Sequence, residues 1–134
     1  MIIMVDDEPR RMDAYVRELR DTGYSVEMCS SVDTALANLE ANLPQVRLLI
    51  LDVMMPPGQA FKNVDTQDGL RTGERFYERV RQLSVDLPVF FLTNVSDPNL
   101  TKKYLRERHC KVLHKEYYQP FELADEVRRM IGPP

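Results

Sequence analysis

Five short apolar segments recur along this chain, and helical patterns lie between them. The segments are rich in β-branched residues and nearly continuous rather than alternating, which is typical of strands buried on both faces of a parallel sheet. They comprise residues 2–5, 25–29, 46–51, 88–92 and 111–113. A chain with this pattern has to cover both faces of one sheet, and that requirement constrains its fold more than any other feature.

The stretches that follow the apolar segments place apolar residues on one helical face. They are residues 9–21, 32–41, 72–83, 121–131 and a helix opened by Ser96-Asp97-Pro98, with Leu100, Tyr104 and Leu105 on its apolar side. Strands that alternate with helices predict βαβ units with right-handed crossovers, and hence an α/β three-layer sandwich. The length of 134 residues suits one domain, so we expect a single domain over residues 1–134.

Residues 54–69 form an unusually long loop with neither a helical nor a strand pattern. Loops of this length are uncommon in compact domains and are usually functional or mobile. We expect Gly58 and Gly69 to permit hinging, and Phe61 to be an exposed aromatic side chain of the kind that marks a contact. Two interpretations stay open, namely a lid or partner-recognition element and a solvated insertion without a role.

Composition and charge exclude several classes of protein. The formal net charge is −3, whereas a general nucleic-acid binder has a basic footprint. No apolar run approaches the roughly 18 residues of a membrane span, and the N-terminus lacks the basic region of a signal peptide. Cys29 and Cys110 lie far apart, and His109 and His114 are more readily explained as surface side chains than as metal ligands. We therefore expect a reduced, cytoplasmic domain that neither binds nucleic acid directly nor enters a membrane.

The residues that stand after the apolar segments are acidic, hydroxyl-bearing or basic. Asp6 and Asp7 follow the first segment, Asp52 follows the third, Thr93 follows the fourth, and Lys115 stands close behind the fifth. Ligands of an open parallel sheet bind outside the carboxyl ends of its strands. If the first and third strands are neighbours, three carboxylates converge on one small volume.

Three carboxylates without a cation between them would repel one another and raise each other's pKa. Mg²⁺ would relieve this repulsion, because that ion prefers hard oxygen ligands. Asp6 and Asp7 would hold the metal, and Asp52 would be a nucleophile that forms an aspartyl phosphate. The Thr93 hydroxyl and the Lys115 ammonium can bind phosphoryl oxygens. Together these groups are the parts that phosphoryl transfer needs.

A simpler explanation accounts for part of this set. Asp is a good turn and N-cap residue, and acidic side chains before a helix suit its dipole. For Asp6 and Asp7 alone, this explanation is as good as a metal site. It does not explain why Asp52, Thr93 and Lys115 stand near the ends of three further strands, so the complete set favours phosphoryl chemistry.

Five motifs, taken in order, resemble those of a bacterial two-component receiver domain. They are Met4-Val5-Asp6-Asp7-Glu8; Leu51-Asp52-Val53-Met54-Met55-Pro56, which fits the family's D-x-x-M-P around the phosphorylated aspartate; Phe91-Leu92-Thr93; Val112-Leu113-His114-Lys115; and Pro120-Phe121-Glu122-Leu123. The resemblance spans essentially the whole chain. It implies a CheY-like, flavodoxin-like (βα)5 fold with a parallel five-stranded sheet in the order 2-1-3-4-5. In that order Cys29 and Cys110 lie on opposite edge strands.

The resemblance implies that Asp52 is the phosphoacceptor, which receives its phosphoryl group from a histidine kinase or a histidine phosphotransfer protein. Asp6, Asp7 and Asp52, with the backbone carbonyl of Met54, resemble the family's Mg²⁺ site. A chain of this kind catalyses its own phosphorylation and dephosphorylation, but it is not a multiple-turnover enzyme.

The resemblance further implies that Thr93 is the switch hydroxyl, which moves toward the phosphoryl group, and that Lys115 is the lysine of the site. The surface of the fourth helix, fifth strand and fifth helix would be the output face. A downstream protein partner or an effector domain would bind there, and a second copy of the chain is a further candidate partner.

Several positions depart from the family's pattern near the site. Val112 stands three residues before Lys115, where the family usually has a switch Tyr or Phe, so no aromatic flip can occur there. Glu116 follows Lys115 where the family has a proline in a cis bond. A cis bond to Glu116 would cost about 2.5–4 kcal/mol, so we expect a rebuilt or strained loop. Asn94 follows Thr93 where a smaller residue is usual, which would narrow the mouth of the site.

Two functions from different classes remain in competition. The first is a receiver that switches on phosphorylation of Asp52. The alternative is a non-phosphorylated pseudo-receiver that acts as a constitutive protein-interaction module; the departures favour it, and the intact carboxylates, Thr93 and Lys115 oppose it. A phosphatase would need a second acid two residues after Asp52, where Met54 stands. The sequence does not distinguish a stand-alone regulator from a domain of a longer protein.

Overall fold

The computed structural model describes residues 1–95 and 97–134. Its centre is a parallel five-stranded sheet in the order β2-β1-β3-β4-β5. The strands are β1 (Ile2–Val5), β2 (Val26–Cys29), β3 (Leu48–Leu51), β4 (Val89–Thr93) and β5 (Cys110–His114). The predicted strand order is therefore confirmed, and each strand falls close to its predicted segment.

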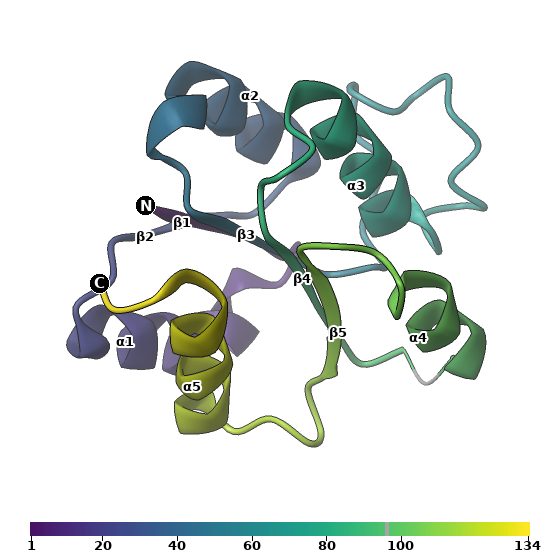
Figure 1. The fold of residues 1–134 in the computed structure, drawn as a ribbon. Helices are drawn as coiled ribbons and strands as arrows, with labels where there is room; N and C mark the ends of the chain where they lie inside the picture. The colour runs from purple at the N-terminus through teal and green to yellow at the C-terminus, as the bar shows by residue number, and fades with distance from the viewer. Residues whose placement is uncertain (96) are drawn as a thin grey trace.

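Helices cover both faces of the sheet and complete three layers, with α2 and α3 over one face and α1 and α5 side by side against the other (Figure 1). The helices are α1 (Asp13–Thr22), α2 (Val32–Asn42), α3 (Thr72–Leu83), α4 (Pro98–Tyr104) and α5 (Pro120–Ile131), with short 3-10 helices at Pro9–Met12 and Leu43–Gln45. Side chains of α4 join the same apolar cluster as those of α2 and α3. The architecture is the predicted flavodoxin-like (βα)5 sandwich.

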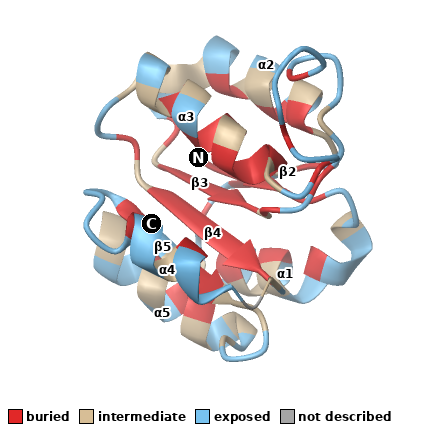
Figure 2. Cartoon of the chain, turned by 90° about the vertical axis from the view of Figure 1, so that its right-hand side faces the viewer, coloured by how far each residue is buried: buried red, intermediate tan, exposed pale blue. Residues whose placement is uncertain are grey.

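The core consists of two apolar clusters, one on each face of the sheet. Strands β1, β3 and β4 are buried along their whole length, whereas the edge strands β2 and β5 are partly exposed (Figure 2). Fully burying an aliphatic or aromatic side chain contributes about 1.5–3 kcal/mol, so the three central strands fix the frame of the sheet. Cys29 and Cys110 lie on the opposite edge strands as free thiols, as the resemblance implied.

Local signals in the sequence set the helix ends. Ser31 Oγ accepts a hydrogen bond from the amide three residues on at 3.2 Å, and Asp97 Oδ1 accepts one from the amide two residues on at 2.9 Å, so each caps the following helix. Ser96, which we expected in the opening of α4, lies outside the described residues. The prediction for Leu105 was wrong, because α4 ends one residue earlier and this side chain is exposed.

The segment between β3 and α3 lacks helix and strand, as predicted, but the expectation for its aromatic residue was wrong. Phe61 is buried and packs on Phe76 of α3, with ring centroids 6.1 Å apart. The Asp33 carboxylate at the start of α2 accepts hydrogen bonds from the Gln59 and Ala60 amides at 2.9 and 2.7 Å. The middle of the loop is therefore fastened to both helices. Phe61 is the single aromatic residue of the loop and is not part of a helical or strand pattern of apolar residues, so the sequence did not indicate that it is buried.

Candidate functional site

The register of neighbouring strands brings the predicted site residues to one edge of the sheet. Val5 pairs with Leu51 at the ends of β1 and β3, and the Asp52 amide donates to the Val5 carbonyl at 3.1 Å. At the end of β4, the Thr93 carbonyl accepts from the Lys115 amide at 2.9 Å. The backbone pairing thus continues one residue past the ends of β3 and β5 and fixes the backbone positions of Asp52 and Lys115.

Asp6, Asp7 and Asp52 form an acidic cluster, in which one carboxylate oxygen of each lies within 4.8 Å of the other two. Asp6 is buried, Asp52 exposes 14% of its side chain, and Asp7 is exposed. Burial raises the pKa of Asp52, and the charge of Asp6 adds to this effect while Lys115 opposes it. Burial and the charge of Asp6 also raise the pKa of Asp7. The cluster therefore holds more negative charge than its surroundings neutralise.

This donor set suits a small, hard divalent cation. Converging carboxylate oxygens are the protein ligands that Mg²⁺ prefers, and the exposed side of the cluster leaves room for the water ligands that this ion retains. Met54, whose carbonyl the resemblance adds to the set, lines the same pocket. That assignment of the Met54 carbonyl stays a prediction.

Lys115 supplies the positive charge of the site. Its Nζ lies 2.9 Å from the Asp6 carboxylate and 3.5 Å from that of Asp52. Burial works against the ammonium, but the hydrogen bond to Asp6 and the charges of both aspartates outweigh it and raise the pKa of Lys115. The lysine is therefore a cation at neutral pH, and it is bound more closely to Asp6 than to Asp52.

Thr93 is fully buried at the end of β4, and its Oγ1 accepts a hydrogen bond from the Val95 amide at 3.0 Å. The hydroxyl is thus connected to the backbone that leads toward α4. Asn94 is exposed and lines the mouth of the pocket, where its size was expected to matter.

The pocket around these groups has a volume of about 330 Å³. Its lining comprises Asp6, Asp7, Glu8, Arg11, Asp52, Met54, Thr93, Asn94, Val95 and Lys115. Sequence reasoning did not single out Arg11, which forms an exposed ion pair with Glu8. Met54 is the single residue of the long loop 54–69 that lines this pocket, so the rest of the loop does not cover the aspartates in this structure.

One further residue of the site has no polar side chain to reveal it. The Gly73 amide in α3 donates to the Val53 carbonyl at 2.8 Å, and a Cβ on Gly73 would lie 2.1 Å from the carbonyl oxygen of Asp52. Such an approach is closed to any other residue, so glycine lets α3 press against the backbone that carries the nucleophile candidate. The signal was present in the sequence, because an isolated Gly in a helical pattern costs stability unless packing requires it.

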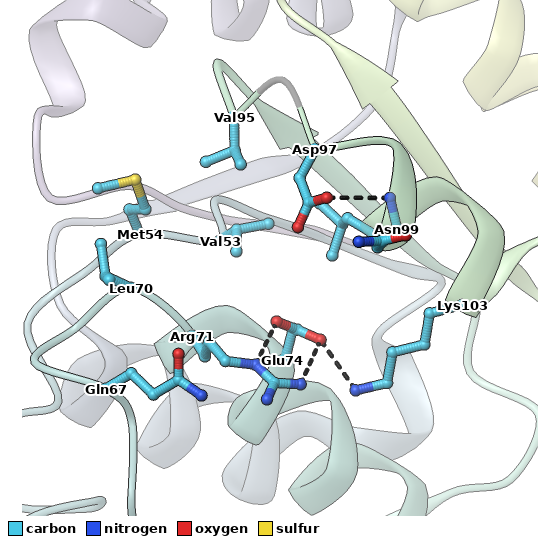
Figure 3. Close-up of a pocket in the computed structure, with 11 residues that line it drawn as sticks. Val53, Met54, Gln67, Leu70, Arg71, Glu74, Val95, Asp97, Asn99 and Lys103 are labelled. Carbon is cyan, nitrogen blue, oxygen red and sulfur yellow. Dashed lines mark hydrogen bonds and ion pairs between the residues drawn. The ribbon is translucent and has the colours of Figure 1, made fainter.

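A second pocket of about 460 Å³ lies beside the first, on the side of α3 and α4 (Figure 3). It is lined by Val53, Met54, Gln67, Leu70, Arg71, Glu74, Val95, Asp97, Asn99, Leu100 and Lys103. Met54 and Val95 line both pockets, so these two residues form the shared wall. Figure 3 shows Glu74 between the side chains of Arg71 and Lys103.

Glu74 is a buried carboxylate with a full set of partners. It accepts hydrogen bonds from Arg71 at 2.8 and 3.1 Å, from Lys103 at 3.0 Å and from the Tyr104 hydroxyl at 3.0 Å. Burial alone would raise the pKa of Glu74, but these hydrogen bonds lower it to about 2. The cluster joins the first turn of α3 to the end of α4.

Aromatic rings from α3, β4 and α4 pack together, and β5 supplies none of them. Val112 of β5 is partly buried and packs against the apolar cluster that contains Tyr104 of α4. Its ring lies 4.9 Å from that of Phe91 and 5.2 Å from that of Tyr77.

Fold and site together define the family. A profile of the response regulator receiver domain matches residues 2–128, and the chain belongs to this family. It is the receiver domain of a two-component response regulator. The acidic cluster of Asp6, Asp7 and Asp52 fits the phosphorylation and magnesium site of such domains.

Known relatives come from several sources. The transcriptional regulatory protein DltR of Streptococcus agalactiae is 29% identical over 92 residues, which cover 69% of this chain and 34% of the relative. The two-component response regulator ORR21 of Oryza sativa is 28% identical over 114 residues, 85% of this chain and 14% of the relative. The structure of chemotaxis protein CheY4 of Vibrio cholerae superposes with a TM-score of 0.74 at 25% identity and 96% coverage of each chain. The chain thus spans about a third or less of the curated relatives named here.

Receiver domains of response regulators interact with histidine kinases and with effector domains. They generally bind Mg²⁺ at an acidic pocket, and the three aspartates supply one here. None of the helices in the described part of the chain has the length and apolarity needed to cross a membrane.

Proposed function

We propose that this domain is a phosphoacceptor whose Asp52 takes a phosphoryl group from a histidine kinase or a histidine phosphotransfer protein in a Mg²⁺-dependent reaction. The observation that carries the proposal is the incomplete pairing of Asp52. One of its oxygens accepts a hydrogen bond from the Val53 amide at 2.7 Å, and the other lies 3.5 Å from the Lys115 ammonium. That ammonium lies closer to Asp6, at 2.9 Å. Asp52 therefore faces the pocket with an oxygen free to react.

In the proposed step, an Asp52 carboxylate oxygen forms a bond to phosphorus while the bond from phosphorus to the donor atom breaks in line with it. The donor keeps that bonding electron pair and takes up a proton. Hydrolysis removes the phosphoryl group again, because water replaces the Asp52 oxygen on phosphorus and the carboxylate is restored. The chain thus acts on its own side chain and is not a multiple-turnover enzyme.

Lys115 and Thr93 would bind the transferred group. The ammonium of Lys115 is already at the edge of Asp52, where it can neutralise a phosphoryl oxygen. The Thr93 hydroxyl can donate its proton to another phosphoryl oxygen, and a movement toward it would release the Val95 amide. Such a movement would change the wall that the two pockets share, and so bias the connection to α4.

Asp6, Asp7 and Asp52 would hold Mg²⁺, with the Met54 carbonyl as a further ligand. Bound there, the ion neutralises the carboxylates and the charge of the phosphoryl oxygens. The exposed position of Asp7 leaves this part of the pocket open to solvent exchange.

We expect the output face to be the surface of α4, β5 and α5, which would contact a downstream protein or an effector domain. A homodimer through this face is a further candidate assembly. The free thiols of Cys29 and Cys110 suit a reducing, cytoplasmic location.

Intact-mass analysis after incubation with phosphoramidate and Mg²⁺ tests the proposal. We expect a gain of one phosphoryl group that EDTA prevents and that Asp52→Asn abolishes. The matched control is Asp21→Asn, which removes an exposed carboxylate from α1 and should leave the gain intact.

A gain in the Asp52→Asn variant would overturn the assignment of the phosphoacceptor. If the folded wild-type protein neither gains mass nor binds Mg²⁺, the constitutive interaction module is the better description.

A further inference from the structure

The segment that follows Lys115 is built differently from the family's lysine-proline pattern. All peptide bonds between described residues are trans. The chain turns after β5, and the Tyr117 amide donates to the His114 carbonyl at 2.9 Å. Lys115 sits at the start of this turn, so its ammonium reaches Asp6 only while the turn keeps its position.

The turn receives a hydrogen bond from the opposite end of the sequence. Tyr15 in α1 points its hydroxyl at the turn, donating to the Tyr118 carbonyl at 2.7 Å, and the Lys115 carbonyl lies 3.4 Å from the same oxygen. The Tyr15 ring packs against the apolar cluster beneath the sheet, as does Tyr118. One side chain of α1 therefore touches both ends of the stretch from Lys115 to Tyr118.

Other anchors of the turn lie at its two ends. On the side of β5, the Lys115 amide donates to the Thr93 carbonyl. On the side of α5, Gln119 and Glu122 form a reciprocal capping box. Among the described residues, no further donor reaches the carbonyls of Lys115 and Tyr118. The Tyr15 hydroxyl thus contacts the two carbonyls of the turn that neither anchor reaches.

We propose that Tyr15 is a positioning residue of the phosphoacceptor site, which holds the turn after β5 so that the Lys115 ammonium lies between Asp6 and Asp52. Tyr15 does not itself line the pocket, and its hydroxyl reaches the site only through the backbone of Lys115, so it acts through that residue. This inference rests on the proposed function, because it assigns Tyr15 a part in the same phosphoryl transfer.

The Tyr15→Phe variant removes the hydroxyl and keeps the ring. Displacing a charged group by a fraction of an ångström can cost a large factor in rate, so we expect phosphorylation by phosphoramidate with Mg²⁺ to slow about tenfold. In a Lys115→Ala background, Tyr15→Phe should cause no further loss, because the two changes remove one and the same contribution.

Tyr24→Phe is the matched control. The Tyr24 hydroxyl also donates to a backbone carbonyl, that of Gly132, and its ring packs in the same apolar cluster, but far from the aspartates. Its loss should leave the phosphorylation rate within about twofold of wild type, as expected for a contact outside the site. A wild-type rate in Tyr15→Phe, or an equal loss with and without Lys115, would overturn the inference.

A second measurement does not depend on phosphorylation. In ¹H–¹⁵N spectra, Tyr15→Phe should shift the amide resonances of Lys115 and Glu116 and speed their hydrogen exchange, and Tyr24→Phe should not. Unchanged resonances at these two positions would refute the positioning role. A wild-type chain that takes no phosphoryl group but shows these shifts would refute the proposed function and leave the link between Tyr15 and the turn standing.

Discussion

The carboxylates of Glu74, which is buried, and Asp52, which is partly buried, lie on either side of the wall formed by Met54 and Val95, and their surroundings differ sharply. Glu74 accepts four hydrogen bonds from three side chains, and its pKa falls to about 2. Asp52 accepts a hydrogen bond from the Val53 amide and has one long contact, to the Lys115 ammonium. Burial raises the pKa of Asp52. The same chemical group is a firmly bound structural anchor in one pocket and has only two hydrogen bonds, one of them long, in the other.

The difference shows how partner number separates the two roles. A carboxylate that accepts four hydrogen bonds, three of them from two cationic side chains, is stabilised as an anion and has little tendency to react. A carboxylate that burial disfavours and few donors compensate is poised to react or to bind a cation. We therefore expect changes at Glu74 to act on stability and changes at Asp52 to act on chemistry, and the following experiments test that division.

The largest effect is expected from Glu74→Ala. It removes the carboxylate that Arg71, Lys103 and Tyr104 share, and breaking a buried charge cluster from one side costs about 3–5 kcal/mol of unfolding free energy. Urea denaturation measures the loss. In the control Glu78→Ala, an exposed carboxylate of the same helix pairs with Arg75, and its removal should cost less than about 1 kcal/mol. Equal losses in the two variants would contradict the anchoring role.

The pH dependence of stability tests the same carboxylate by a second route. Its native pKa of about 2 lies below the ordinary value near 4.3, so ionised Glu74 favours the folded state. This contribution is fully present above the ordinary value and is lost as the pH falls toward 2. We expect it to be on the order of 3 kcal/mol.

Unfolding free energies of wild type and Glu74→Gln, measured between pH 5 and pH 2.5, should therefore converge as the pH falls. Curves that stay parallel over this range would show that the carboxylate has no lowered pKa. Glu78→Gln should follow the wild-type curve, because that side chain is about half exposed.

A smaller effect of opposite sign is expected from Asp52→Asn. This change removes a charge that burial and Asp6 disfavour, so without Mg²⁺ it should raise the unfolding free energy by about 1 kcal/mol. The gain should shrink as the pH falls through the raised native pKa toward the ordinary value for Asp. Thermal unfolding in EDTA measures the stability gained by the variant, and thermal unfolding in Mg²⁺ measures the effect of the ion. Mg²⁺ should stabilise wild type more than the variant. A variant less stable than wild type in EDTA would show that Lys115 already compensates Asp52.

The aspartate pocket was largely predictable because topology determines it. The ends of parallel strands meet at one edge, so Asp6, Asp52 and Thr93 could be placed together from the strand order alone. The Glu74 cluster was not predictable in this way. It joins the first turn of α3 to a helix end about thirty positions along the chain, and nothing in the local pattern of either helix specifies that contact.

Phe61 and Leu105 show the complementary failure. Both predictions relied on local context, a polar loop in one case and a continued helical face in the other. The loop instead packs onto α3, and α4 ends one residue before Leu105, the last apolar position of the predicted helical face. The hydrogen bond from the Tyr15 hydroxyl to the Tyr118 carbonyl joins residues 103 positions apart, and no pattern in the sequence predicts it.

The two thiols at the outer strands of the sheet make this chain convenient for spectroscopy. Cys29 and Cys110 are buried, and burial raises the pKa of both, that of Cys110 to about 12. Since the thiolate is the form that reacts with maleimides, neither side chain should label appreciably at neutral pH. A cysteine introduced at an exposed position of α4, such as Lys102→Cys, would then carry a fluorophore without prior removal of the native ones.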